Sequence, residues 1–374
     1  MNPGFQIVVP VYNEADVLPD VLHFALAAGY LHHVIFVDDA STDASPQILQ
    51  AWEQSHAIRA VRLDRNRRKE GAIREVLEVL HSQGKLEPYT LLLDADSFIQ
   101  CPANGDCVAA IREAIASMRD RGLAGMAFRI DAAIDRASNL LDRCQYADYS
   151  ALQFDQWLTS HQEQLWVING PGGMFRSDLL LRTLRDMQPD FETGDLLITV
   201  KLMRSGLGVA FYPELVVKTF CPRTVAAYFA QRRRWERGTT KVLWWQRRFY
   251  AGLFAKPRLL ALGLLVHLSV YPGIAWLLLC AVSAPDRLRA VLDWFAASFV
   301  AWFAVNLAKG VWNKRMRGEG HFGRFVIHSA LNGFLWFAVT LWARLAGFTD
   351  AILYLVAQRA GAMQRRPQAG AALD

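Results

Sequence analysis

The chain has 374 residues, 53% of them apolar, with a formal net charge of +6 and a mean hydropathy of +0.12. This length has room for one large domain, a smaller part and a sizeable core. The basic residues cluster near long uncharged runs and no nucleic-acid-binding module is present. The composition therefore favours lipid headgroups and nucleotide phosphates as anionic partners and argues against nucleic acid.

Strand-like and helix-like patterns alternate in the first part of the chain. Phe5–Val11 is a continuous apolar run, as expected of a buried parallel strand. The alternation predicts an α/β domain with a doubly wound, mostly parallel sheet. Strands are predicted at 5–11, 33–37, 58–63, 90–96, 125–130 and 206–212, and helices at 15–28, 45–54, 108–120, 139–157 and 224–248. A further helix is entered from the turn 64–72 and runs to about residue 80, and another starts in the segment 191–199.

Two aspartates close the fourth predicted strand, Thr90–Asp96. Side chains alternate along an extended chain, so Asp94 and Asp96 are expected to point to the same side. Two carboxylates at the end of a strand suit Mg²⁺ or Mn²⁺, which in turn holds phosphate oxygens. The alternative is a pair of solvated turn residues.

Four other features of the sequence each have a functional interpretation and a purely structural one. Asp39 could accept a hydrogen bond from a base or ribose, or cap a helix. The basic turn 64–72 could bind phosphate at a helix N-terminus, or be a solvated charge run. Gly172 and Gly173 could bring backbone amides close to a ligand, or form a simple loop. Asp195 could be a general base, or complement a helix dipole.

A basic segment, Gln231–Trp235, lies on the predicted helix 224–248. Gln231, Arg234 and Trp235 are spaced i, i+3 and i+4, so they share one face. A guanidinium and an indole on that face could clamp a pyrophosphate and stack on a sugar ring.

Seven segments in order resemble a family 2 glycosyltransferase of the cellulose synthase, chitin synthase and hyaluronan synthase branch. The resemblance covers roughly residues 5 to 240 and implies a GT-A-type catalytic domain. The segments are VVPVYNEA (8–15), VDDASTD (37–43), the turn with Lys69, LDAD (93–96), GPGGMFR (170–176), TGD (193–195) and QRRRW (231–235) with Gly238.

The resemblance implies a role for each matching position. Asp195 would deprotonate the acceptor hydroxyl, with inversion at the anomeric carbon. Asp94 and Asp96 would bind Mg²⁺ or Mn²⁺, with Asp96 the more direct ligand. The implied nucleotide-binding residues are Tyr12, Glu14, Asp39, Lys69, Asp94 and Arg234, and the implied acceptor-binding residues are Gly172, Gly173, Gln231 and Trp235.

The chain departs from the family pattern in three places. The position before Asp195, acidic in many relatives, is Gly194, so a single carboxylate is expected there. The turn before Lys69, RNRRK, is more basic than is usual. Most polymerising relatives begin with membrane spans, whereas here the first predicted strand begins at once.

Three long apolar runs in the last third predict an α-helical transmembrane region. Spans are expected at 259–283, 288–308 and 325–343, and an interfacial helix at 345–357. Nine Lys or Arg against one Glu between Gln231 and Arg258 place the catalytic domain on the cytoplasmic side of the inner or plasma membrane. The expected domains are 1–222 catalytic, 223–257 interfacial, 258–358 membrane and 359–374 tail.

These patterns lead to one principal function and two alternatives. The principal hypothesis is an inverting transferase that adds a hexose or N-acetylhexosamine from a nucleotide sugar to a growing polysaccharide, with UDP as the carrier that the resemblance implies. The alternatives are a transferase that adds one sugar to a lipid, and an inactive membrane scaffold. A pore built from three spans would need several copies, so a homo-oligomer is also an expectation. Five cysteines without C-x-x-C spacing are expected to be reduced: Cys101, Cys107, Cys144, Cys221 and Cys280.

Overall fold

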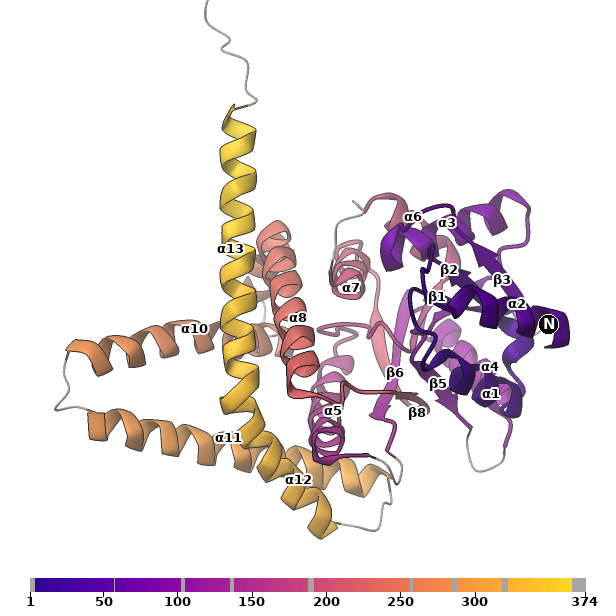
Figure 1. Cartoon of the computed structure of the whole chain (residues 1–374). Coiled ribbons are helices and arrows are strands. Elements are labelled where there is room, and N and C mark those ends of the chain that lie inside the picture. Colours follow the sequence, from indigo (N-terminus) through magenta and orange to yellow (C-terminus); the bar gives the residue numbers. More distant parts are fainter. Residues whose placement is uncertain are drawn as a thin grey trace, which may run out of the picture.

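The computed structural model describes residues 4–56, 58–101, 105–134, 138–187, 192–255, 258–283, 288–317 and 322–364. Most of the predicted tail, after residue 364, lies outside these ranges. Strands and helices alternate first, and within the described residues only helices follow (Figure 1). The strands are β1 (Phe5–Val11), β2 (Val34–Asp38), β3 (Arg59–Arg62), β4 (Tyr89–Leu92), β5 (Ser97–Gln100), β6 (Gly125–Ala132), β7 (Gly173–Arg176) and β8 (Val209–Thr219).

The helices form two groups, one around the sheet and one to its side (Figure 1). The first group is α1 (Leu18–Ala27), η1 (Leu31–His33), α2 (Ser45–His56), α3 (Arg68–Ser82), α4 (Cys107–Asp120), α5 (Leu140–Ser160), α6 (Ser177–Arg185) and α7 (Gly194–Arg204). The second is α8 (Val225–Trp245), α9 (Arg247–Gly252), η2 (Leu253–Ala255), α10 (Leu259–Ser283), α11 (Leu288–Arg317), α12 (Phe322–Leu335), η4 (Trp336–Thr340, a π-helix) and α13 (Leu341–Gln364).

All eight strands form one sheet in the order β3-β2-β1-β4-β7-β6-β8-β5. Its first four strands run parallel, as does the pair β6–β8, but β7 is antiparallel to β4 and β6, and β5 is antiparallel to β8. The sheet is therefore mixed, with four parallel and three antiparallel strand pairs, so it is less parallel than predicted. Only residues 93–96 join β4 to β5. This link is too short for the crossover that a parallel neighbour of β4 would require. β5 instead pairs with β8, at the opposite edge of the sheet from β3.

Both faces of the sheet are buried. Along β1, Ile7 and Val9 belong to a core cluster with Leu22 of α1, whereas Val8 belongs to a second cluster with Ile73 of α3. Successive side chains of a strand point to opposite faces, so a strand covered on both sides must be apolar throughout. The run of apolar residues in β1 is therefore continuous because each face of the strand packs into a separate core cluster.

Several strand boundaries in the structure differ from the predicted ones. The strand expected at 90–96 ends at Leu92, so the two aspartates lie in a turn. The last strand, expected at 206–212, extends as β8 to Thr219 and passes a register shift beside Phe128 and Arg129 of β6. β5 was not predicted, and β7 lies inside the predicted glycine turn. The four cysteines that the structure describes are free thiols, as expected: Cys101, Cys107, Cys144 and Cys221.

The helices from α8 onward lie beside the sheet and partly project from it. α13 packs along α8, and α11 and α12 pack on α5. A side chain at Gly347 of α13 would collide with the backbone of α8, 2.3 Å from the carbonyl oxygen of Arg233, so this glycine permits the close crossing. Figure 1 shows α10 and α11 extending away from the sheet, with α13 upright between them and α8.

The expected membrane helices are recovered only in part. α10 coincides with the first predicted span, and the second lies within α11. The third runs through η4 into α13, so the predicted interfacial helix 345–357 is not separate, because it is the middle of α13. Within the described residues one helical segment, Val326–Gln358, is long and apolar enough to cross a membrane, with a mean hydropathy of 1.4. Three spans are therefore not confirmed.

Polar residues join the helices of this region from within. Glu236 of α8, only 5% exposed, accepts a hydrogen bond from Arg344 of α13 at 2.8 Å and lies 3.2 Å from His267 of α10. The hydroxyl of Tyr271, also in α10, donates to Glu236 as well. This network, which we call the Glu236 network, ties α8, α10 and α13 together through a buried charged group.

Candidate active site

The turn after β4 carries the two aspartates. Asp94 makes an ion pair with Lys69, at the start of α3. Asp96 accepts hydrogen bonds from the hydroxyls of Ser97 at 2.8 Å and Thr219 of β8 at 3.3 Å. Their side chains therefore approach each other through a tight turn, in which the amide of Ser97 donates to the carbonyl of Asp94 at 3.0 Å, and not through the strand alternation that was predicted.

Three charged side chains meet beside Gly170. A Cβ placed on this glycine would lie 2.7 Å from Nζ of Lys69, 3.4 Å from Oδ2 of Asp195 and 3.7 Å from Oδ2 of Asp94. The three come from α3, from the turn after β4 and from the first turn of α7. We call this group the Lys69 cluster. Segments more than a hundred residues apart in the sequence thus converge on one place.

Asp195 is held in a fixed orientation. Its Oδ2 accepts the amide of Gly170 at 3.1 Å, and its Oδ1 accepts the amide of Leu196 at 2.8 Å. Burial raises the pKa of this carboxyl above its ordinary value, although Lys69 and the two amides favour the charged form. A carboxylate with one amide on each oxygen keeps a free lone pair on each, so it can accept a further proton.

The ends of β1 and β2 carry the residues expected to hold the nucleotide. Asp39 is buried and accepts the backbone amide of Arg67 at 2.6 Å, in the basic turn before α3. It does not cap α2, which begins at Ser45. Glu14 is half-buried beside the two aspartates, whereas Tyr12 is 47% exposed. Asp39 thus joins the end of β2 to the turn two residues before Lys69, and the nucleotide-binding roles of Tyr12, Glu14 and Asp39 stay predictions.

The site has more carboxyl groups than cations to balance them. Burial and then Asp94 raise the pKa of Asp96 to about 6. Burial followed by Asp96 and Asp94 raises the pKa of Glu14 to about 7. A group of carboxyls that resist ionisation together is suited to a divalent cation. Among the described residues there is no group of three or more His, Cys, Asp or Glu side chains placed to hold a metal ion, so Asp94 and Asp96 as metal ligands stay a prediction.

The glycine turn is placed differently from the expectation. Gly172, at φ 90°, donates its amide to the carbonyl of Leu92 of β4 at 2.8 Å. Gly173 begins β7 and is paired with the same residue of β4. Side chains at these two positions would meet core residues such as Val217 and Phe175. The glycine that faces the charged groups is Gly170, which sequence reasoning missed. The acceptor role of Gly172 and Gly173 stays a prediction.

The basic segment of α8 is organised around a different arginine than expected. Arg232 is largely buried, pairs with Asp148 of α5 at 2.9 Å and lies 4.4 Å from the ring centroid of Trp235. Arg234 is exposed, and Oε1 of Gln231 is buried without a hydrogen-bond partner. Among the described residues, no hydrogen bond or ion pair joins Gln231, Arg234 or Trp235 to the Lys69 cluster. Their expected roles stay predictions.

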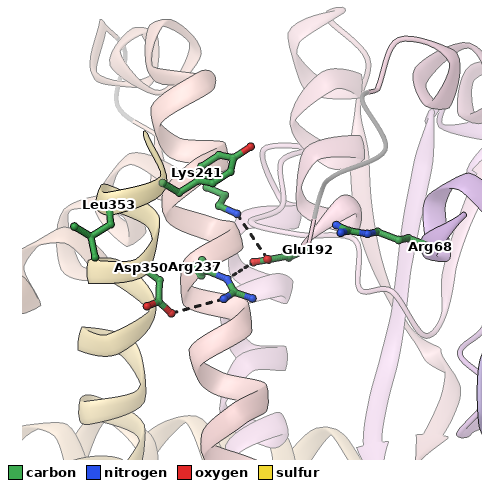
Figure 2. A pocket seen from close by; sticks show the side chains of 7 residues that line it. Arg68, Glu192, Arg237, Lys241, Asp350 and Leu353 are labelled. Atoms are coloured by element: carbon green, nitrogen blue, oxygen red, sulfur yellow. Dashed lines mark hydrogen bonds and ion pairs between the residues drawn. The ribbon is translucent and has the colours of Figure 1, made fainter. Parts of the chain in front are cut away.

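A cavity of about 400 Å³ lies between α8, α13 and the segment before α7. Figure 2 shows Arg237 between Glu192 and Asp350, 2.6 Å and 3.7 Å from their carboxylates, with Arg68 pointing in from the opposite side. Arg68 immediately precedes Lys69 in the sequence, but Lys69, Asp94 and Asp195 do not line the cavity. Its lining residues are Arg68, Glu192, Arg237, Lys241, Asp350, Leu353 and Tyr354.

Comparisons with known proteins identify the family of the chain. The profile of the family described as "Glycosyl transferase family group 2" matches residues 89–305, more than half of the chain, and that of "Glycosyl transferase family 2" matches residues 6–119. A poly-beta-1,6-N-acetyl-D-glucosamine synthase from Staphylococcus epidermidis is 24% identical over 296 residues, which cover 78% of this chain and 67% of the relative.

Two further comparisons bear on parts of the chain or on its fold. A dolichyl-phosphate beta-glucosyltransferase from Drosophila melanogaster is 31% identical over 130 residues, 32% of this chain and 38% of the relative. The mannosyltransferase PcManGT from Pyrobaculum calidifontis, solved with GDP-Man and Mn²⁺, superposes with a TM-score of 0.56 at 18% identity, covering 89% of this chain and 88% of that one. This likeness shows a shared fold. The chain therefore belongs to the family 2 glycosyltransferases and is an enzyme with a GT-A-like mixed α/β sheet.

Proposed function

We propose that the protein is a membrane-bound, inverting glycosyltransferase that extends a polysaccharide with a hexose or N-acetylhexosamine taken from a UDP-sugar. The observation that carries this proposal is the meeting of Lys69, Asp94 and Asp195 around Gly170. The staphylococcal relative, a poly-N-acetylglucosamine synthase by name, supports N-acetylglucosamine as the sugar and a polymer as the product.

On the donor side, Asp94 and Asp96 would hold Mg²⁺ or Mn²⁺ and Lys69 the diphosphate. The bound cation supplies charge neutralisation for the diphosphate as the sugar departs. In the structure Lys69 pairs with Asp94, and burial, which alone would lower its pKa, is outweighed by Asp94 and Asp195, so the pKa lies above its ordinary value. Lys69 therefore stays charged and can stabilise the negative charge of the leaving group.

On the acceptor side, Asp195 would act as the general base. The acceptor hydroxyl gives its proton to a free lone pair of the carboxylate while its oxygen forms a bond to the anomeric carbon. The bond from that carbon to the diphosphate oxygen breaks on the opposite face, so the configuration inverts. Amides on both carboxylate oxygens of Asp195 fix its orientation toward the incoming hydroxyl.

The helices after α8 would place this site at a lipid surface. On α10, four apolar side chains are at least 42% exposed: Leu262, Leu265, Val266 and Leu268. α13 exposes further apolar side chains, including Trp342 and Val356. Lipid contact would remove this surface from water, and the basic stretch 231–258 would lie on the cytoplasmic side.

A second candidate is a transferase that adds a single sugar to a lipid phosphate. The cavity of about 400 Å³ favours it, because Arg68, Arg237 and Lys241 line it next to α13. Glu192 and Asp350 line it too and pair with Arg237, so the cations exceed the acids by one. The Drosophila relative, a dolichyl-phosphate glucosyltransferase by name, also favours it. Family membership favours either enzyme over the inactive scaffold.

One experiment tests the proposal. Membranes that contain the full chain receive labelled UDP-N-acetylglucosamine, UDP-glucose or GDP-mannose, each with Mg²⁺ or Mn²⁺, and the products are sized. We expect a ladder or a polymer from UDP-N-acetylglucosamine, which EDTA abolishes. A single labelled glycolipid would support the second candidate, and no transfer from any donor would refute both.

A further inference from the structure

Glu70 lies in the first turn of α3, and its side chain reaches the first residue of α7. A Cβ placed on Gly194 would lie 2.0 Å from Oε1 of Glu70 and 2.2 Å from its Cδ. Gly194 does not have a positive φ, so its backbone would accept any L-residue. The carboxyl group of Glu70 therefore occupies the space that a side chain at position 194 would need. The glycine is required by this contact and not by backbone conformation.

This contact places a second carboxyl group next to the base. Gly194 immediately precedes Asp195, and Glu70 immediately follows Lys69. The N-terminus of α7 favours a negative charge at this point. Burial raises the pKa of Glu70 to about 7; Lys69 lowers it, whereas Asp195 and Asp94 raise it further. The sequence, read alone, leaves Asp195 as the only acid at the start of α7, but the fold supplies another from α3.

We propose that Glu70 is a positioning residue of the acceptor side, which supplies from helix α3 the carboxyl group that a side chain at position 194 would otherwise bring beside Asp195. The inference rests on the proposed function, because it assigns Asp195 to the acceptor. Glu70 limits where an acceptor hydroxyl can lie relative to Asp195. It should affect the transfer rate and not the affinity for the nucleotide.

The steric overlap allows a double-mutant cycle. Gly194→Ala should displace the Glu70 side chain, since a Cβ there would collide with its Cγ, Cδ and Oε1, and thermal melts of the variant measure the cost in stability. We expect Glu70→Ala and Gly194→Ala each to lower kcat by about 10- to 100-fold. Gly194→Ala should have no further effect in the Glu70→Ala background. Glu70→Ala combined with Gly194→Glu should recover most of the rate, because the carboxyl returns from the other helix.

The assays use the full chain in membranes, with labelled UDP-N-acetylglucosamine for transfer and UDP for binding by calorimetry. Gly252→Ala is the matched control, because nothing lies within 4 Å of a Cβ there. UDP affinity should stay within about twofold in every variant. The proposal is overturned if Gly194→Ala is equally harmful in both backgrounds, if the Glu70→Ala, Gly194→Glu pair fails to recover the rate, or if Glu70→Ala weakens UDP binding. An inactive wild-type chain that still binds UDP would instead refute the proposed function.

Discussion

The sheet domain and the helical region distribute charge and apolar surface in opposite ways. In the sheet domain, strands such as β1 are buried in two apolar cores, and the charged groups gather at one edge around Lys69. In the helical region, apolar side chains such as Leu265 of α10 and Val356 of α13 face outward, 53% and 59% exposed. The buried centre there holds the Glu236 network.

This inversion indicates two different surroundings. Water favours a surface of polar groups around an apolar core, whereas lipid favours apolar groups outside and tolerates polar groups only where they pair inside. Within the described residues, the segment Val326–Gln358 is the one long and apolar enough to cross a membrane. The opposite placement of charge in two parts of one chain supports the proposal that only the second part contacts a membrane.

The largest expected effect is at the charged edge of the sheet domain. Asp195→Asn should lower kcat by about 1,000-fold or more, because the amide cannot accept the acceptor proton, while UDP affinity stays nearly unchanged. Initial rates and calorimetry with UDP check both. The control is Asp178→Asn, an acid with 54% side-chain exposure at the start of α6, which should leave both values unchanged. Loss of UDP binding in Asp195→Asn would place this residue on the donor side instead.

The interior of the helical region should be almost as sensitive, but in stability. Glu236→Gln removes the anion that Arg344 and His267 face in a buried place, so we expect a loss of about 3 kcal/mol in the free energy of unfolding. Glu78→Gln is the matched control, since its 2.6 Å pair with Arg185 is exposed and should contribute less than about 1 kcal/mol. Denaturant titration of both variants in detergent measures the difference. Equal losses would contradict the view that the Glu236 network is the buried centre.

The outer face of the helical region can be tested with vesicles. Replacing both Leu262 and Leu265 of α10 by serine should weaken association with phosphatidylglycerol vesicles by about 2 kcal/mol, because less apolar surface is transferred from water. Flotation of chain made by cell-free synthesis gives the bound fraction. The matched change is Leu26→Ser on α1, which is 43% exposed in the sheet domain and should have no effect. If both variants float as well as the wild-type chain, α10 does not contact lipid.

The smallest expected effect depends on pH. The folded-state pKa of Asp96 is raised to about 6, above the ordinary 3.8. The folded state therefore loses stability as pH rises from the ordinary value through 6. Without divalent metal, Asp96→Asn should raise the free energy of unfolding by about 1–2 kcal/mol above pH 7, and the gain should vanish below pH 4. Thermal melts across pH measure it. A gain that is independent of pH would show that the carboxyl charge is not the cause.

Sequence reasoning found most of the fold and most of the charged cluster. The apolar runs at β1, β2 and β6 were placed within one or two residues, since strands buried on both faces leave a strong signal. Asp94, Lys69 and Asp195 were named from their motifs, and the structure brings them together. By contrast, β5 and β7 were missed, because four-residue strands beside a turn have no distinct pattern. The spacing on α8 pointed to Arg234, whereas the arginine that pairs with α5 is Arg232. Helical spacing does not show which arginine faces α5.

The sequence by itself determined that buried strands alternate with helices, that acids follow the strands, and that the last third is rich in apolar residues. These properties are local, because each depends on a short run of neighbouring side chains. Only the tertiary structure decided that the sheet is mixed, that Gly170 faces the charges and that Glu70 fills the space beside Gly194. Contacts between residues more than a hundred positions apart depend on how helices pack on the sheet. That packing is a property of the whole chain, so the pattern of any single segment does not predict it.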